Sequence, residues 1–255
     1  MSALGAAAVG VPGPVQPGFF VERDLNRRRL TVAFRALLIL PHAVVLYVLS
    51  LVGAFVSIAG WFAALVLGRL PAPIAGFLGD IVAYLARCQA YAMLLTDQYP
   101  PFGFSAEGYP VGIELAPPGR LNRLAVLFRM ILVIPAAILS GLITLGWTLL
   151  SFFIWLVVLV TGRTPGPVFD ATAALVRYGT RYSAYFWLLT DAYPSGLFGD
   201  PDGQLALSPG AKRLMVLLIV FPAVFYLVIS LVAALLAINF AGSESAMAAP
   251  GLHLT

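Results

Sequence analysis

The chain contains apolar segments that are too long for the interior of a soluble domain. The first, residues 36–67, has 32 residues without a single charge, and as an α-helix it would be about 48 Å long. A helix that crosses a membrane needs only about 20 predominantly apolar residues. In the whole chain 61% of the residues are hydrophobic and 10% are charged, whereas soluble domains carry roughly 25% charged residues. We therefore expect an integral membrane protein.

The sequence repeats itself at a shift of 94 residues. Apolar composition alone would align leucine with leucine, but the matching positions also include arginine, proline, tryptophan and aspartate. They are Arg29 with Arg123, Arg35 with Arg129, Pro41 with Pro135, Trp61 with Trp155, Arg69 with Arg163, Arg87 with Arg181, and Asp97 with Asp191. The chain therefore carries a tandem duplication. A truncated third copy is predicted from residue 209 onward, because only the basic start, a proline and one apolar run are present there.

The repeat predicts an all-α fold, a polytopic membrane helix bundle. Each full copy contributes two helices and the third contributes one, which gives about five transmembrane helices. Pro41 and Pro135 are expected to kink the first helix of each copy near its start, and the Gly-Arg-x-Pro turns end it. The predicted order is a flexible tail (1–22), membrane repeat 1 (23–101), a cytoplasmic loop (102–118), membrane repeat 2 (119–197), a loop (198–211), a final span (212–240) and a second flexible tail (241–255). Residues 109–115 alternate like a short strand, with residues 204–207 as a candidate partner.

The second helix of each copy, residues 74–95 and 168–189, leaves two topologies open. It either crosses the membrane or lies in the interface as an amphipathic helix. If both second helices cross, most arginines fall on one side of the membrane and the two copies run in the same direction. If they lie in the interface, the copies are inverted. The bias of basic residues favours the first arrangement, with a multi-pass protein in the cell membrane and a cytoplasmic N-terminus.

Arg35 and Arg129 lie just inside apolar helices, and Asp97 and Asp191 lie where the second helices end. We expect each arginine to pair with the aspartate of its own copy and to clasp the two helices together. Binding of an anionic lipid headgroup by these arginines is the alternative. The aspartates also suit a turn that satisfies backbone donors, and an acid–base role for them lacks a suitable partner in the sequence.

Polar residues form a stripe on each second helix. The stripes consist of Asp80, Arg87 and Gln89 in repeat 1 and of Asp170, Arg177 and Arg181 in repeat 2. Four of them have no polar counterpart of the same kind in the other copy, so they are freer to mark a site than residues that both copies share. The stripes would line an ion or lipid path, or they would form charge pairs that hold the bundle together.

No residue pattern in the chain points to enzymatic chemistry, a cofactor or a metal. Cys88 is the single cysteine, and His42 and His253 are far apart in the sequence, so a cysteine- or histidine-rich metal site is not expected. The basic residues lie beside membrane segments and are not interleaved with aromatics as in a nucleic-acid-binding patch. We expect no catalytic residues and no nucleic-acid partner.

The repeated motifs resemble those of an uncharacterised family of bacterial, mostly actinobacterial, integral membrane proteins, a domain of unknown function. The shared motifs are Arg-x5-Pro, Thr-Gly-Arg-x-Pro at residues 161–165, and Leu-Leu-Thr-Asp-x-Tyr-Pro-Pro-Phe at residues 94–102. Leu67 and residues 195–197 depart from the pattern. The resemblance implies the repeat architecture but no activity.

The function that we expect is that of a non-enzymatic scaffold or accessory subunit, in contact with anionic lipids through a basic cytoplasmic face. Small residues such as Gly53 and Gly60 would allow a membrane-protein partner or a second copy to approach closely. A small transporter or channel that uses the polar stripes is the second hypothesis, and a lipid-acting enzyme is the third.

Overall fold

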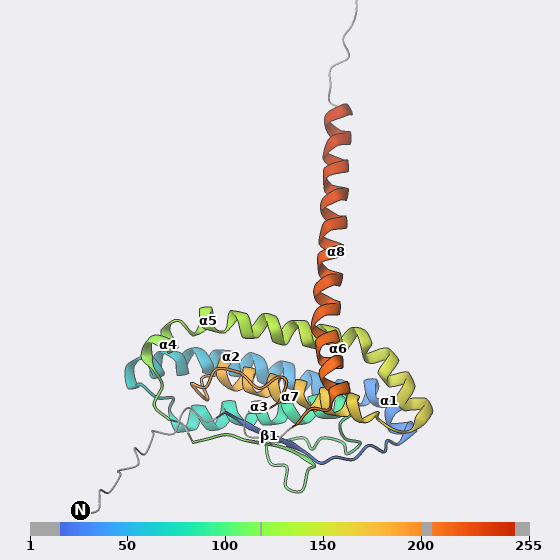
Figure 1. The fold of residues 1–255 in the computed structure, drawn as a ribbon. Helices are drawn as coiled ribbons and strands as arrows, with labels where there is room; N and C mark the ends of the chain where they lie inside the picture. Colours follow the sequence, from blue (N-terminus) through green and yellow to red (C-terminus); the bar gives the residue numbers. More distant parts are fainter. Residues whose placement is uncertain (1–15, 118, 200–205, 248–255) are drawn as a thin grey trace, which may run out of the picture.

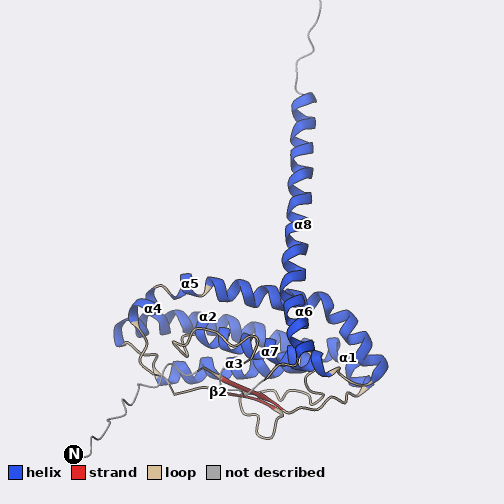
Figure 2. Cartoon of the chain, in the orientation of Figure 1, coloured by secondary structure: helices blue, strands red, loops and turns tan. Residues whose placement is uncertain are grey.

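The computed structural model describes residues 16–117, 119–199 and 206–247, and this part of the chain forms stacked layers from which one long helix projects (Figure 1). The first layer contains α2 (Leu40–Leu67) and α6 (Ile134–Thr161), and the second contains α3 (Ala72–Ala92) and α7 (Gly166–Phe186). Two short strands, β1 (Gly18–Val21) and β2 (Val111–Glu114), lie against the second layer (Figure 2). The projecting helix is α8 (Pro209–Met247). The short helices α1 (Arg29–Leu38), α4 (Arg123–Leu127) and α5 (Arg129–Leu132) lead into α2 and α6.

Proline and glycine set the ends of the long helices. Pro41 and Pro135 lie in the first turn of α2 and α6, where the missing N–H removes no helical hydrogen bond. The helix assignment is interrupted at Ile39 and Val133, just before each proline, although both residues keep helical dihedral angles and donate to the carbonyls of Arg35 and Arg129. Gly68 and Gly162 cap the C-terminal ends with φ of 69° and 70°, a left-handed conformation that glycine adopts at little cost.

The two copies are docked head to tail. The indole N–H of Trp61 near the end of α2 donates to the Val126 carbonyl in α4, and the indole of Trp155 near the end of α6 donates to the Val32 carbonyl in α1, both at 2.8 Å. In each copy, the end of the long helix therefore contacts the short helix at the start of the other copy. This is possible only if α2 and α6 are antiparallel, so the prediction that both copies run in the same direction is wrong.

The second helices of the copies are the centre of the protein. Helix α3 contacts α2, α7 and β2, and 14 of the 21 residues of α7 are buried. In the described part of the chain, three segments are long and apolar enough to cross a membrane: Arg29–Leu67, Arg129–Thr161 and Pro209–Phe240. Helices α3 and α7 are not among them, because polar and small residues cover the faces that pack against other layers. The all-α bundle is confirmed, but the expected five spans are reduced to three candidates.

Two segments that were expected to be flexible tails are partly ordered. Strand β1 pairs antiparallel with β2, with Gly18 opposite Glu114 and Val21 opposite Val111. The strand predicted within residues 109–115 is therefore present, but its partner comes from residues 18–21. Residues 206 and 207 are not in a strand, and residues 204 and 205 lie outside the described residues. Helix α8 extends to Met247, beyond the predicted end at residue 240. Residues 1–15 and 248–255 also lie outside the described part.

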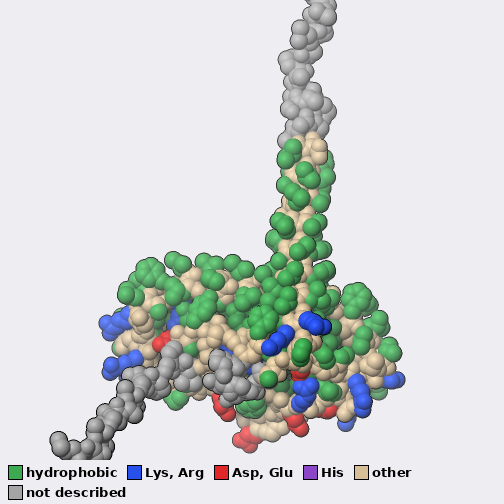
Figure 3. All heavy atoms as spheres, in the orientation of Figure 1, with side chains coloured by type: hydrophobic (Ala, Val, Ile, Leu, Met, Phe, Trp, Pro, Cys, Tyr) green, Lys and Arg blue, Asp and Glu red, His purple; other side chains and the backbone are tan. Residues whose placement is uncertain are grey.

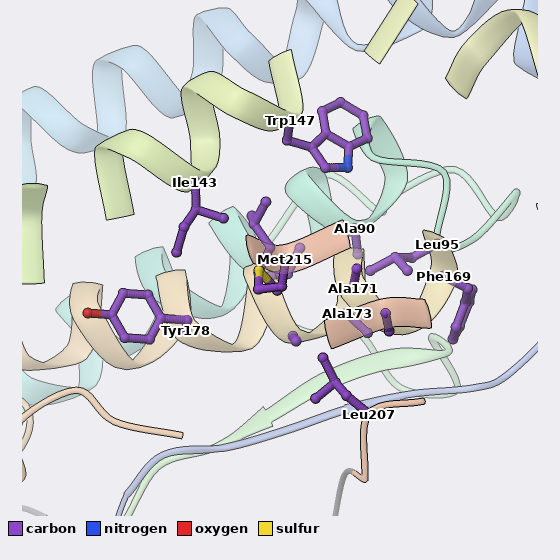
Figure 4. Packing of buried hydrophobic residues seen from close by; sticks show 14 of the residues in the cluster. Ala90, Leu95, Ile143, Trp147, Phe169, Ala171, Ala173, Tyr178, Leu207 and Met215 are labelled. Carbon is purple, nitrogen blue, oxygen red and sulfur yellow. The ribbon is translucent and has the colours of Figure 1, made fainter. Parts of the chain in front are cut away.

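The largest buried cluster joins α6, α7 and the base of α8. Met215 lies among Ile143, Trp147 and Ala173 in this cluster (Figure 4), and the Trp147 indole donates to the Thr172 hydroxyl at 3.0 Å. At the crossing of α6 and α8, a Cβ on Gly146 would lie 2.0 Å from the Leu218 carbonyl oxygen. The backbones of the two helices therefore approach each other so closely that only glycine fits.

We predict that Gly146→Ala weakens the docking of α8, because backbone atoms of Leu218 would have to move. Gly141→Ala is the matched control on the same helix, since a Cβ there has no neighbour within 4 Å and alanine favours a helix by about 1 kcal/mol over glycine. Thermal unfolding in detergent is read from the modification of Cys88 by a thiol-reactive dye. Cys88 is 2% exposed, and burial raises the pKa of its thiol to about 11. The Gly146 variant should melt several degrees lower and the Gly141 variant should not.

Candidate functional site

The Leu-Leu-Thr-Asp motif forms the C-terminal cap of the second helix in both copies. In repeat 1 the Leu95 amide donates to the Ala90 carbonyl and the Leu94 amide donates to the Tyr91 carbonyl, which is the Schellman arrangement. Leu94 and Leu188 have φ of 66° and 64°, values that a leucine side chain rarely tolerates. The strained turn exposes backbone carbonyls toward the helices that precede α2 and α6. Buried arginines occupy that position.

Two arginines of repeat 1 bind this turn. Arg27 donates to the carbonyls of Leu94 and Leu95 at 2.9 and 2.7 Å, and burial lowers the pKa of Arg27 despite the nearby charge of Asp97. Arg35 donates to the carbonyls of Tyr91 and Thr96 and forms an ion pair with Asp97, with Nη2 and Oδ1 2.5 Å apart. These contacts tie α1 to the end of α3.

The corresponding arginine of repeat 2 has fewer partners. Arg129 donates to the carbonyls of Tyr185 and Thr190 at 2.7 and 2.9 Å, and its guanidinium carbon lies 4.0 Å from the centre of the Tyr185 ring. Its Nε and Nη2 have no hydrogen-bond partner among the described residues, and Asp191 is exposed. Arg35 lies over the Tyr91 ring in the same way, with its guanidinium carbon 4.5 Å from the ring centre, so both copies have the cation–π contact. The copies therefore share the arginine position but not the ion pair.

The difference between the copies gives a direct test of the clasp. Removing one partner of a buried ion pair costs up to about 3 to 5 kcal/mol, and we expect about 3 kcal/mol for Arg35→Gln and less for Asp97→Asn, because the Asp97 side chain is 18% exposed. The loss in the double variant should be smaller than the sum of the single losses. Asp191→Asn is the matched control and should change the unfolding temperature little. Additive losses in the Arg35 and Asp97 variants would contradict the clasp.

The polar stripes of α3 and α7 hold loops. Arg87 donates to the Gly103 carbonyl at 2.8 Å, and Arg181, its counterpart, donates to the Ser195 carbonyl at 2.9 Å. Arg177 donates to the Gly196 carbonyl at 2.8 Å. Burial lowers the pKa of Arg87. Each arginine therefore reaches the segment that follows its own helix, and Arg181 also donates to the Pro17 carbonyl before β1.

The acidic residues of the stripes lie beside other segments of the chain. Asp170 pairs with Arg23, a residue of the segment before α1, and accepts a hydrogen bond from the Ser208 hydroxyl. This ion pair joins the start of repeat 1 to repeat 2. Asp80 is exposed and lines a shallow cavity of about 370 Å³ beside Leu115, and Gln89 lies next to Gly179 of α7.

His42 marks a second difference between the copies. Its Nδ1 lies 2.5 Å from the Tyr84 hydroxyl, and its ring stacks on Phe102 with the centroids 4.2 Å apart. Ala136 stands at the same position in repeat 2, and a cavity of about 310 Å³ lies there beside Tyr178. The imidazole thus fills in one copy a space that is open in the other.

Exposed arginines gather at both ends of the repeat pair, in two basic clusters. The first consists of Arg28, Arg29 and Arg163, where Asn26 forms a β-bridge with Arg163 and Arg29 lies over Gly162. The second consists of Arg69, Arg120 and Arg123, where Arg123 lies over Gly68 and donates to the Val66 carbonyl at 2.9 Å. Each cluster takes residues from both copies because the copies meet head to tail.

Sequence reasoning missed Arg23 and Arg27 as individual sites. Neither residue is repeated: Leu121 stands at the position of Arg27 and Pro117 at that of Arg23. The rule that unshared charges mark special contacts would have found them. A cavity of about 550 Å³ lies over this region, lined by Glu22, Arg27, Arg28 and Asp97 among others.

The apolar helices and the paired copies define a membrane protein built from a tandem repeat. The family described as a domain of unknown function, DUF4389, matches residues 29–103 and again residues 123–197, and the chain belongs to this family. Each match covers one structural copy, from α1 to the turn after α3 and from α4 to the turn after α7, so the duplication is confirmed. No curated protein and no solved structure matches the chain.

Proposed function

We propose that this membrane protein is a non-enzymatic scaffold or accessory subunit that contacts anionic lipid through its basic residues. The observation that carries the proposal is the pair of basic clusters at the ends of the docked copies. Among the described residues, no carboxylate lies within ion-pair distance of Arg28, Arg29 or Arg163 or of the three arginines in the second cluster. Their charge is therefore free to act on groups outside the chain.

The position of the clusters suits lipid headgroups. Arg29 and Arg123 begin the helices that precede α2 and α6, and Arg69 and Arg163 directly follow α2 and α6. Arginines at the ends of apolar helices reach the headgroup level with their charged ends, and each basic side chain near an anionic leaflet contributes about 1 kcal/mol. In the orientation that we propose, both clusters lie at the inner leaflet, in keeping with the bias of basic residues toward the cytoplasm.

The contacts of the polar stripes support a scaffold over a transporter. Arg87, Arg177 and Arg181 are tied to loop carbonyls and Asp170 to Arg23, contacts that support a role of these groups in holding the fold together. The strand layer carries Glu22, Glu107 and Glu114, which are exposed. In the proposed orientation this acidic layer faces the cytoplasm and is available to a protein partner.

The lipid contact is tested with the full chain in vesicles that contain spin-labelled phosphatidylglycerol or phosphatidylcholine. We expect the wild-type protein to prefer the anionic lipid several-fold in its first lipid shell. Arg29→Gln with Arg163→Gln removes two cluster charges and should abolish most of the preference at this end, because each basic side chain near an anionic leaflet contributes about 1 kcal/mol. Arg69→Gln with Arg123→Gln should act in the same way at the other end.

Ser105→Glu with Ala116→Glu is the control, since it lowers the net charge equally but on the strand side of the protein, where both residues are exposed. This variant should keep the lipid preference. Equal losses in the control and the cluster variants would show that only net charge matters and would contradict the cluster proposal. Ion or lipid flux through reconstituted vesicles that stops in Asp80→Ala would contradict the scaffold.

A further inference from the structure

Helix α8 indicates where the membrane lies relative to the layers. After Pro222 it has left the body of the protein, and every residue from Ala223 to Phe240 is exposed and uncharged. These 18 residues make a helix of about 27 Å, which is close to the hydrocarbon thickness of about 30 Å. A helix whose apolar side chains are all exposed is stable in lipid but not in water. The direction of α8 therefore gives the approximate direction of the membrane normal.

Contacts along α8 place the two helical layers at different depths. Gly210 of α8 lies against Pro167 at the start of α7, whereas Leu218 lies against Gly146 at the middle of α6. The eight residues between the two contacts correspond to about 12 Å along the helix axis. Lys212 and Arg213 lie between these two levels, where charged side chains mark the headgroup region. Helix α6 thus lies near the boundary between the headgroup region and the hydrocarbon core.

If α2 crossed the membrane along its own length, charged groups would lie at the bilayer centre. Gly53, at the middle of α2, contacts Ile81 at the middle of α3. The neighbouring Asp80 is exposed, and Gly79 contacts Leu115, which follows the exposed Glu114. A spanning α2 would hold both carboxylates at half its length, facing lipid. Uncompensated charges at that depth are strongly disfavoured.

The exposed surfaces agree with a membrane parallel to α2 and α6. Hydrophobic side chains cover the face of the layers from which α8 projects, and most of the visible acidic side chains lie on the opposite face (Figure 3). On α2 the apolar residues that are more than half exposed recur along the whole helix, as Val44, Tyr47, Leu51, Phe55, Ile58, Phe62 and Val66. A helix with one face on protein and a wide apolar face outward suits the boundary between headgroups and acyl chains.

We propose that the paired repeats lie flat in one leaflet, with α2 and α6 parallel to the membrane and their exposed faces on the acyl chains of that leaflet, and that α8 alone crosses the bilayer. The pseudo-twofold axis between the copies is then along the membrane normal. Both basic clusters lie at the headgroup level, because they are at the ends of helices that run along it. The layer of β1 and β2 faces water.

The depth of labels along α2 and α8 tests this arrangement in the full chain. Single cysteines replace Val44, Leu51, Ile58 and Val66 on α2, and Val224, Leu231 and Ile238 on α8, in a Cys88→Ala background. Each is labelled with a nitroxide and reconstituted in vesicles. Immersion depth is read from the ratio of relaxation by oxygen, which concentrates in lipid, to relaxation by a water-soluble nickel complex.

On α8 the depth should be greatest at Leu231 and smaller at both ends, which calibrates the measurement. On α2 the four labels span about 33 Å of helix, yet they should report nearly equal, shallow depths, with a range less than half that found on α8. A maximum at Leu51 and Ile58 as large as the maximum on α8 would overturn the proposal. Labels on α2 that neither oxygen nor nickel reaches would also overturn it, because a second copy or another protein would then cover this face. The result does not depend on lipid charge, so it can fail while the cluster proposal stands.

Discussion

The head-to-tail docking of the two copies is the contact on which the rest of the structure depends. In a single copy, the end of the long apolar helix has no packing partner. The short helix before it, which carries the buried arginine, also has none on one side. The other copy supplies both. The indole of each copy's tryptophan, Trp61 or Trp155, donates a hydrogen bond to a carbonyl of the other copy. The backbone amides of Leu121 and Arg27 likewise donate to the carbonyls of Gly68 and Gly162 in the other copy.

Several features follow from that docking. Helices α3 and α7 become the shared centre of the protein, so their polar residues must find partners inside it, and they find them in loop carbonyls and in Arg23. The arginines at the helix ends come together in pairs taken from different copies. The base of α8 then packs on α6 and α7 through Gly146, and the residues from Ala223 to Phe240 are exposed. One docking mode thus determines the buried polar network, the charged ends and the position of the projecting helix.

The duplication, the helix boundaries and the positions of Arg35 and Asp97 could be predicted from the sequence, because they depend on local patterns and on the comparison of one copy with the other. The relative direction of the copies could not. It depends on which surfaces of the two copies are complementary, and hydropathy is the same for parallel and antiparallel arrangements. The charge bias favoured spanning second helices because it put the arginines before each first helix on one side of the membrane and left Arg69 and Arg163 on the other. The docking instead brings Arg163 to Asn26 and places Arg123 over Gly68, beside Arg69.

The unshared residues carry the difference between the copies. Arg27 and His42 occur only in repeat 1, and the shared aspartate of this repeat, Asp97, forms an ion pair with Arg35. Repeat 2 has Leu121 and Ala136 at the first two positions and an exposed Asp191 at the third. The shared arginine remains in both because it binds carbonyls that the strained leucine turn presents. Duplication therefore preserved the contacts of the backbone, and the copies diverged in the side chains around them.

The most direct test of the head-to-tail docking is a disulfide between Asn26→Cys and Arg163→Cys in a Cys88→Ala background. These positions form an antiparallel β-bridge, in which Cα atoms are about 4.5 to 5.5 Å apart, a separation that a disulfide spans. Mild oxidation of the membrane-embedded chain should give an intramolecular bridge, seen as a mobility shift that reductant reverses. If the copies ran in the same direction, the two cysteines would be separated by about the length of α6, or 42 Å, and the thiols would stay free or link separate chains.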